Sequence, residues 1–230
     1  MASDFRFSSL PYSVEGFAER AKTRGMPLDR AGWMMAQPMS YGIDAGRAVD
    51  ANGKIIEGRR LEDLVAPDDW RMSAVLIPVI AREPEVSVLL TLRPAHLNLH
   101  AGQIAFPGGK IEADEGPVAA ALREAEEEVG LSPALVTPLG LLDLHKTGTG
   151  FRIVPVLSLV EPGFIPSPDP AEVAEVFEVP LSFLMAERNH LQHYLDWKGR
   201  RILFHAMSYE DRFIWGATAA ILRNLFERLY

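Results

Sequence analysis

A tight glycine turn followed by a glutamate-rich helix is the feature that most limits how this chain can fold. Pro107-Gly108-Gly109 ends an apolar run that is typical of a buried strand. Residues 117–129 then read as a helix, with proline in the first turn and Gly130 directly after the last one. A strand, a tight loop and a helix in succession predict a helix folded back against a sheet.

The predicted helix has two faces of different character. Its apolar stripe, which we expect to pack on the core, consists of Val118, Leu122, Ala125 and Val129. Three acids gather within about 100° of each other on another face, namely Glu124, Glu127 and Glu128. Glu126 points roughly the opposite way. Carboxylates at this spacing repel one another unless a cation lies between them, and such oxygen-rich clusters bind hard divalent cations.

A solvated surface is the alternative explanation for a run of glutamates, and taken alone this run favours it. Two further features favour a site. The glutamates lie near the C-terminal end of the helix, where the helix dipole makes negative charge unfavourable. Another acid, Glu115, follows the glycine turn. The cluster is therefore interpreted as a metal site.

The remaining pattern predicts an α/β fold in which strands and helices form layers around one sheet. Buried strands are expected at 74–81 and 86–92, with a third short strand ending at Phe106. Later strands are expected at 136–142, 153–160 and 175–179, a hairpin at 193–197 and 201–207, and helices at 13–21 and 215–230. Residues 162–170 form a polar linker with four prolines.

Length and composition limit the class of protein. The 230 residues suggest a main domain at 71–230, with residues 1–70 as an N-terminal extension packed on it. A net charge of −8 argues against a broad basic face for nucleic acid, and the absence of cysteine excludes disulfides and a cysteine nucleophile. The longest apolar run, 74–81, is far shorter than the roughly 20 residues of a membrane span. We expect a soluble, cytoplasmic protein.

The acidic helix and the turn before it resemble the Nudix box, Gly-x5-Glu-x7-Arg-Glu-U-x-Glu-Glu-x-Gly-U, where U is a bulky apolar residue. Each polar and glycine position of that pattern is matched, by Gly109, Glu115, Arg123, Glu124, Glu127, Glu128 and Gly130. Ala125 is smaller than the usual residue at its position. The resemblance implies the αβα Nudix sandwich with a mixed central sheet, and hydrolysis of a nucleoside diphosphate derivative.

The resemblance also implies roles for individual residues. Glu124, Glu127 and Glu128 would be the principal ligands of Mg²⁺ or Mn²⁺, Glu115 would assist, and Gly109 would add a carbonyl oxygen. Arg123 would orient the carboxylates through hydrogen bonds. The general base stays open between Glu124 and a later acid, Glu172 or Glu175.

The segment before the box is similar to the signature of the coenzyme A (CoA) pyrophosphatase subgroup, Leu-Leu-Thr-x-Arg followed by Gly-x3-Phe-Pro-Gly-Gly. It matches at Leu89-Leu90-Thr91-Leu92-Arg93 and at 102–109, with Pro94 and Asn98 as departures. The resemblance implies cleavage of CoA or acyl-CoA to 4′-phosphopantetheine and 3′,5′-ADP. Hydrolysis of ADP-ribose, NADH or another nucleoside diphosphate is the alternative, and a Nudix fold that only binds its ligand is the third hypothesis.

Four residues are candidates for contact with such a small nucleotide substrate: Arg93, Gln103, Phe106 and His145. Arg93 ends a strand beside the predicted metal site, where a basic group would meet phosphate. Phe106 could stack on adenine or belong to the core. Gln103 could equally hold its loop. His145, with Lys146, could meet the 3′-phosphate that distinguishes CoA. No nucleic acid or membrane partner is expected, and a homodimer is left open.

Overall fold

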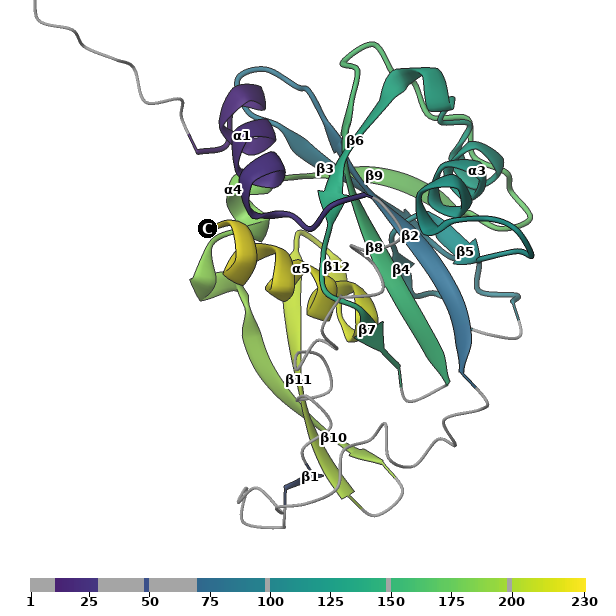
Figure 1. The fold of residues 1–230 in the computed structure, drawn as a ribbon. Helices are drawn as coiled ribbons and strands as arrows, with labels where there is room; N and C mark the ends of the chain where they lie inside the picture. Colours follow the sequence, from purple (N-terminus) through teal and green to yellow (C-terminus); the bar gives the residue numbers. More distant parts are fainter. Residues whose placement is uncertain (1–10, 29–47, 50–69, 98–99, 148–149, 198–199) are drawn as a thin grey trace, which may run out of the picture.

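The computed structural model describes residues 11–28, 48–49, 70–97, 100–147, 150–197 and 200–230 (Figure 1). Most of the predicted N-terminal extension lies outside these residues, as do Asn98 and the turn predicted at 198–199. No helix within the described ranges is long and apolar enough to cross a membrane.

A mixed sheet with strand order β4-β3-β2-β8-β6 forms the centre of the fold, as the sequence predicts. Strand β2 pairs in parallel with β8, and antiparallel with β3 and with the short β5. Strand β9 adds to β3, and β7 adds to β8. The strands are β2 (Arg71–Ile80), β3 (Ser87–Leu92), β4 (Ile104–Ala105), β5 (Gly108–Lys110), β6 (Val136–Leu141), β7 (His145–Lys146), β8 (Phe151–Val160) and β9 (Glu175–Pro180).

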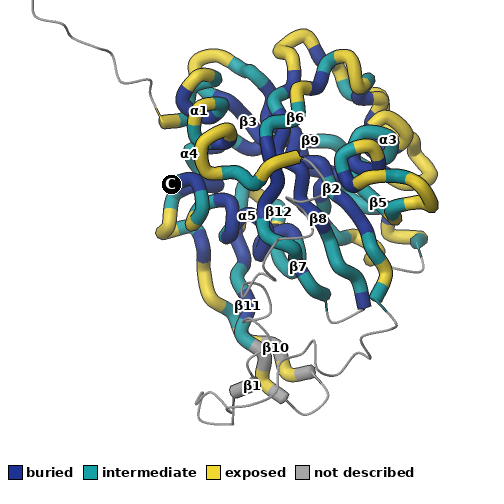
Figure 2. Tube along the Cα trace, viewed as in Figure 1, coloured by how far each residue is buried: buried dark blue, intermediate teal, exposed yellow. Residues whose placement is uncertain are grey.

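Helices cover both faces of this sheet, so its central strands are buried on both sides (Figure 2). On one face lies α3 (Pro117–Val129), and on the other lies α5 (Gly216–Leu229). Leu76 of β2 packs in the α3 cluster and Ile77 in the α5 cluster. This alternation explains the continuous apolar runs of β2 and β8.

The N-terminal helix α1 (Val14–Arg24) is held against the end of the chain. Ser13 caps it as predicted, accepting a hydrogen bond from the Gly16 N–H (3.1 Å). The Arg24 guanidinium donates to the Leu229 carbonyl (2.8 Å), and the rings of Tyr12 and Tyr230 stack with centroids 5.4 Å apart. The boundary between extension and main domain at residue 70 stays a prediction.

A second, smaller sheet contains the predicted hairpin, which extends away from the central sheet (Figure 1). Its strands are β1 (Ala48–Val49), β10 (Leu191–Trp197), β11 (Arg200–Tyr209) and β12 (Arg212–Ile214). The short helices η4 (Pro133–Leu135), α4 (Leu181–Leu184) and η5 (Glu187–Asn189) were not predicted, because a single turn leaves no periodic pattern.

The buried side of α3 differs from the predicted stripe. Ala125 and Val129 are buried as expected, but Val118 and Leu122 are only half-buried. Ala120 and Ala121 lie fully in the core instead. Small side chains face the sheet because α3 packs closely on β2 and β5. Compared with the predicted stripe, α3 is therefore rotated so that Ala120 and Ala121 face the sheet. The rotation brings the helix backbone, and with it the glutamates, close to the glycine turn.

Strand β5 was also missed, since two of its three residues are glycines, which are poor strand formers. Here glycine permits a close approach between neighbouring backbones. A Cβ on Gly108 would lie 2.4 Å from the Ala74 carbonyl oxygen and 2.6 Å from the Val75 Cα. The glycine turn therefore lies in the central sheet, directly beside β2.

Candidate active site

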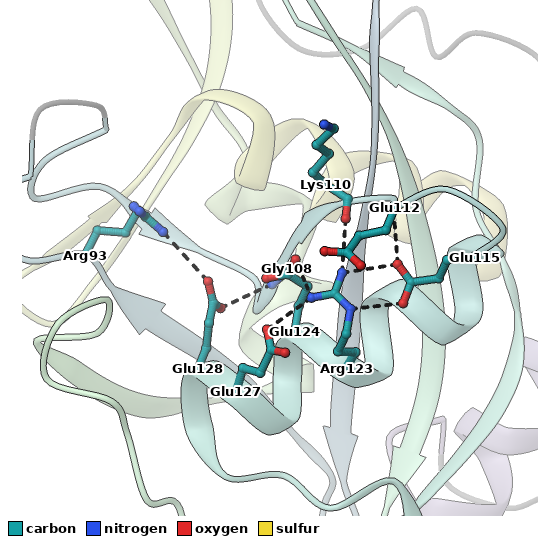
Figure 3. A network of polar contacts seen from close by, with 9 residues as sticks. All are labelled: Arg93, Gly108, Lys110, Glu112, Glu115, Arg123, Glu124, Glu127 and Glu128. Atoms are coloured by element: carbon teal, nitrogen blue, oxygen red, sulfur yellow. Dashed lines mark hydrogen bonds and ion pairs between the residues drawn. The ribbon is translucent and has the colours of Figure 1, made fainter.

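Arg123 binds three of the predicted site carboxylates at once (Figure 3). Its Nε donates to Glu115 Oε1, and one terminal nitrogen donates to both Glu124 Oε1 and Glu127 Oε2, each at 3.0 Å. The other terminal nitrogen donates to the Lys110 carbonyl oxygen (3.2 Å). The hydrogen bonds from Arg123 lower the pKa of Glu115. Arg123 thus fixes the side chains of three acids against the β5 backbone.

Glu128 differs from these acids because it is buried, with 4% of the residue exposed. Its carboxylate accepts a hydrogen bond from the Gly108 N–H (3.2 Å), and the Arg93 guanidinium is 3.8 Å away. Burial, together with the charges of Glu172 and Glu124, raises the pKa of Glu128 to about 7 against the lowering effects of the Gly108 N–H and Arg93. Glu128 shares a face of the helix wheel with the half-buried Glu124 and the exposed Glu127, yet it is buried because α3 is turned toward β5.

Glu124 lies against the other glycine of the turn. A Cβ on Gly109 would come within 2.3–2.5 Å of the Glu124 carboxylate, so a larger residue there would displace it. Burial raises the pKa of Glu124, and the charges of Glu127 and Glu172 add to this effect, while Arg123 opposes it. Gly109 therefore leaves room for the Glu124 carboxylate, while Gly108 donates its N–H to Glu128.

The end of β3 brings Arg93 to the site through a closed loop. The Arg93 N–H donates to the Gln103 carbonyl (3.0 Å), and the Gly102 N–H donates to the Arg93 carbonyl (3.1 Å). The Gln103 side chain lies 2.8 Å from His100 Nδ1. Of the four predicted substrate contacts, Arg93 is the one that reaches the glutamates, and Gln103 holds the loop.

Phe106 and His145 lie elsewhere. Phe106 is 4% exposed and packs in the apolar cluster on the α5 side of the sheet, so its position supports packing rather than stacking on adenine. His145 is buried on β7, opposite Ile153 of β8.

The two later acids, Glu172 and Glu175, have different environments in the structure. Glu172 is exposed in the loop before β9, and its charge acts on both Glu124 and Glu128. Glu175, in contrast, is paired with Arg212 at 2.5 Å. This geometry favours Glu172 over Glu175 as the acid nearest to the site.

The donor set fits a divalent cation in its chemistry. Within the described ranges, no three carboxylate or imidazole side chains converge on one point in this arrangement. Arg123 engages both oxygens of Glu115 and one oxygen each of Glu124 and Glu127. Burial, with a smaller effect of neighbouring acids, nevertheless raises the pKa values of Glu124 and Glu128, so negative charge at the glycine turn is incompletely compensated. A hard cation would compensate that charge, and carboxylate oxygens are the ligands it prefers.

Comparison with known proteins decides the family. The family model for the NUDIX domain matches residues 70–198, more than half of the chain. The chain belongs to the Nudix family. Curated relatives are similar over most of their length: an uncharacterized Nudix hydrolase NudL of Photorhabdus laumondii is 41% identical over 167 residues, covering 70% of this chain and 87% of the relative. The NudL of Escherichia coli O7:K1 is 43% identical over 160 residues, covering 67% and 81%.

The solved structures that resemble this chain are more distant in sequence. DR0079 from Deinococcus radiodurans aligns with 80% of this chain and 98% of its own, at 15% identity and a TM-score of 0.46. An Ap4A hydrolase of C. elegans aligns with 48% of this chain and 80% of its own, at 16% identity and a TM-score of 0.43. By its family match and its curated relatives, the chain is a Nudix hydrolase, one of a class of enzymes that act on small nucleotides with divalent cations.

Two contributors to the Nudix site were missed at the level of sequence. The Gly108 N–H is one, since only the close pairing of β5 with β2 reveals that it points at Glu128. The other is the backbone of the proline-rich linker. The Ser167 and Asp169 N–H groups donate to the Val129 and Glu128 carbonyls, at 2.9 and 3.0 Å. Alternation of proline with other residues at 166–170 was the available signal.

Proposed function

We propose that this Nudix hydrolase cleaves the pyrophosphate bond of CoA or acyl-CoA, releasing 4′-phosphopantetheine and 3′,5′-ADP. One observation carries the proposal. The segment whose residues resemble the CoA pyrophosphatase signature meets the catalytic helix at Glu128, through Arg93 at one end and Gly108 at the other. The signature segment is thus adjacent to the helix in space as well as in sequence, and this contact supports the proposal.

Mg²⁺ or Mn²⁺ would be held by Glu124, Glu127 and Glu128, with Glu115 and the Gly109 carbonyl in support. When bound, such an ion neutralises pyrophosphate oxygens and lowers the pKa of a coordinated water. Arg123 engages one oxygen of Glu124 and one of Glu127, so the second oxygen of each would face the ion while Arg123 orients the carboxylate. The remaining contacts to Glu115 and Lys110 would keep the guanidinium in place.

The other side chains have separate roles in this proposal. Arg93 donates to a phosphate oxygen of the substrate from its position beside Glu128. Glu172 accepts a proton from the attacking water at its carboxylate, because it is exposed in the loop before β9 and its charge acts on both Glu124 and Glu128. Arg123 orients the carboxylates and does not contact the substrate. Gln103 orders the loop that carries Arg93.

ADP-ribose or NADH is the second candidate substrate. The observation that favours it is Pro94, which stands where the CoA signature has a small residue. A role in ligand binding alone is the third candidate, and retention of every box glutamate argues against it. Cytoplasmic location, a homodimeric assembly and the absence of a nucleic acid partner stay predictions.

Product analysis tests the proposal. Purified protein with Mg²⁺ or Mn²⁺ is incubated with CoA, ADP-ribose and NADH, and products are identified by mass spectrometry. We expect CoA to be cleaved fastest, with 3′,5′-ADP as product. Faster cleavage of ADP-ribose would refute the CoA assignment. No turnover, together with an unfolding temperature unchanged by either metal, would support the binding role.

A further inference from the structure

The segment 164–173, here called the proline strap, joins β8 to β9 along the C-terminal end of the catalytic helix (Figure 1). It is fixed at both ends, because Phe164 and Val173 are each 3% exposed and belong to the cluster under α3. At its first end the Arg82 guanidinium donates to the Phe164 carbonyl (3.4 Å). At its last end the Ala174 N–H donates to the Leu92 carbonyl (2.8 Å), one residue before Arg93.

Between these ends the strap alternates proline with hydrogen-bond donors. Prolines at 166, 168 and 170 have no N–H and hold the backbone extended. The residues between them, Ser167 and Asp169, therefore present their N–H groups on the same side. Both donate to carbonyls at the end of α3 that have no partner within the helix.

Asp169 connects the helix end to Glu172. Its N–H donates to the Glu128 carbonyl (3.0 Å), so the strap is bonded to the residue whose carboxylate is buried in the site. Its Oδ1 accepts from the Ala171 N–H (2.9 Å), and its carbonyl accepts from the N–H groups of Glu172 (3.0 Å) and Val173 (2.8 Å). Such a side-chain turn fixes the direction in which the following residues leave.

We infer that Asp169 is a positioning residue that fixes Glu172 relative to Glu128 for activation of the attacking water. The inference rests on the proposed function, since it needs Glu172 to act in turnover. Its side chain is exposed and contacts no other acid of the site. Asp169 therefore acts through the turn, and an amide oxygen in place of its carboxylate oxygen should serve equally well.

Three variants separate this role from a structural one. Asp169→Ala removes the acceptor and should lower kcat about tenfold with KM nearly unchanged, because the base is misplaced while binding is intact. Asp169→Asn keeps the acceptor and should retain nearly full turnover. Ser167→Ala is the matched control, since Ser167 contributes its backbone to the strap and its side chain forms no polar contact within the described residues.

A double-mutant cycle with Glu172→Gln decides the mechanism. If Asp169 acts through Glu172, Asp169→Ala should cause no further loss of kcat in the Glu172→Gln background. Equal losses in both backgrounds would overturn the inference, and so would a failure of Asp169→Asn to restore turnover. Wild-type turnover in Glu172→Gln alone would refute the role of Glu172, and this inference with it, while leaving the CoA assignment intact.

Amide hydrogen exchange supplies a measurement that needs no substrate. Exchange at Ala171 should be faster in Asp169→Ala than in Asp169→Asn, Ser167→Ala or the unmodified chain. Unchanged exchange in Asp169→Ala would overturn the inference. A chain that hydrolyses no nucleotide would refute the proposed function, and exchange would still decide whether Asp169 orders the turn.

Discussion

Two glutamates of this fold, the half-buried Glu178 and the buried Glu128, have opposite electrostatic environments. Glu178 on β9 receives a two-pronged pair from Arg82, at 3.1 and 2.7 Å, and a further hydrogen bond from the Ser87 hydroxyl. Burial raises its pKa, but these donors outweigh burial and hold the pKa below its usual value. Glu128 on α3 receives one N–H and has Arg93 at 3.8 Å, and its pKa rises to about 7.

The difference shows how a structural acid is distinguished from a functional one. Glu178 on β9 accepts hydrogen bonds from Ser87 of β3 and from Arg82, which also donates to the Pro162 carbonyl in the loop after β8. The charge of Glu178 is therefore compensated within the protein. Glu128 keeps a charge that the protein leaves largely uncompensated, at a cost in stability. An acid whose charge is incompletely compensated, and which lies in a cluster with other acids, is available to bind an external cation.

The largest effect expected from this contrast is on turnover. Glu128→Gln should lower kcat by about 100-fold or more, because an amide is a poor replacement for a carboxylate ligand. Glu178→Gln should leave kcat within about twofold when equal amounts of folded protein are compared. Glu126→Gln, on the exposed side of α3, is the control on the same helix. Near-normal turnover in Glu128→Gln would eliminate it as a ligand.

Removal of Arg82 should have the next largest effect, on the free energy of unfolding. Arg82→Gln leaves the Glu178 charge half-buried with one donor, and we expect a loss of about 1–2 kcal/mol at pH 7 in urea unfolding. The pKa of Glu178 is lowered by folding, so its contribution is present above the unfolded value and disappears as pH falls through the folded value. The difference between variant and wild type should therefore shrink below about pH 4. A constant difference would show that Arg82 acts by packing.

Glu128→Gln should change the stability of the metal-free protein by a smaller amount and in the opposite direction. The measurement is made with EDTA present, so that no divalent cation binds. Its pKa is raised to about 7, so the favourable contribution of its protonated form is present at acidic pH and is lost as pH rises through 7. Glu128→Gln should then be more stable than wild type at pH 8, by about 1 kcal/mol, and nearly equal to it at pH 5. Thermal unfolding at the two pH values measures this. A less stable variant at pH 8 would mean that the charge is compensated after all.

The comparison also explains what the sequence could predict. The spacing of Glu124, Glu127 and Glu128 and the periodic runs of β2, β3 and α3 are local features, and the structure contains the elements that they predict. The burial of Glu128 was not predictable, because it depends on the rotation of α3, which the small residues Ala120 and Ala121 allow. A wheel shows which residues share a face and does not show how far that face is turned toward a neighbouring strand.

Contacts between residues distant in the chain could not be predicted from the periodicity of the sequence either. The pairing of Arg212 with Glu175 joins β12 to β9, and it removes Glu175 from the candidates for the base. The proline-rich linker was correctly predicted as non-helical and non-strand, but its bonds to the end of α3 depend on where β8 ends in space. Both features arise from packing between elements distant in the chain, which periodicity does not encode.

The parallel pairing of β2 with β8 has a consequence for folding kinetics. These two strands form the middle of the sheet, yet β3, β4, β5, α3, β6 and β7 all lie between them in the chain. Their pairing closes a long loop, and contacts of that kind are slow to form. Helix α3 can acquire its hydrogen bonds early, whereas the strap that follows β8 can reach it only after β8 has docked. Recovery of catalysis during refolding should therefore lag behind recovery of helical signal.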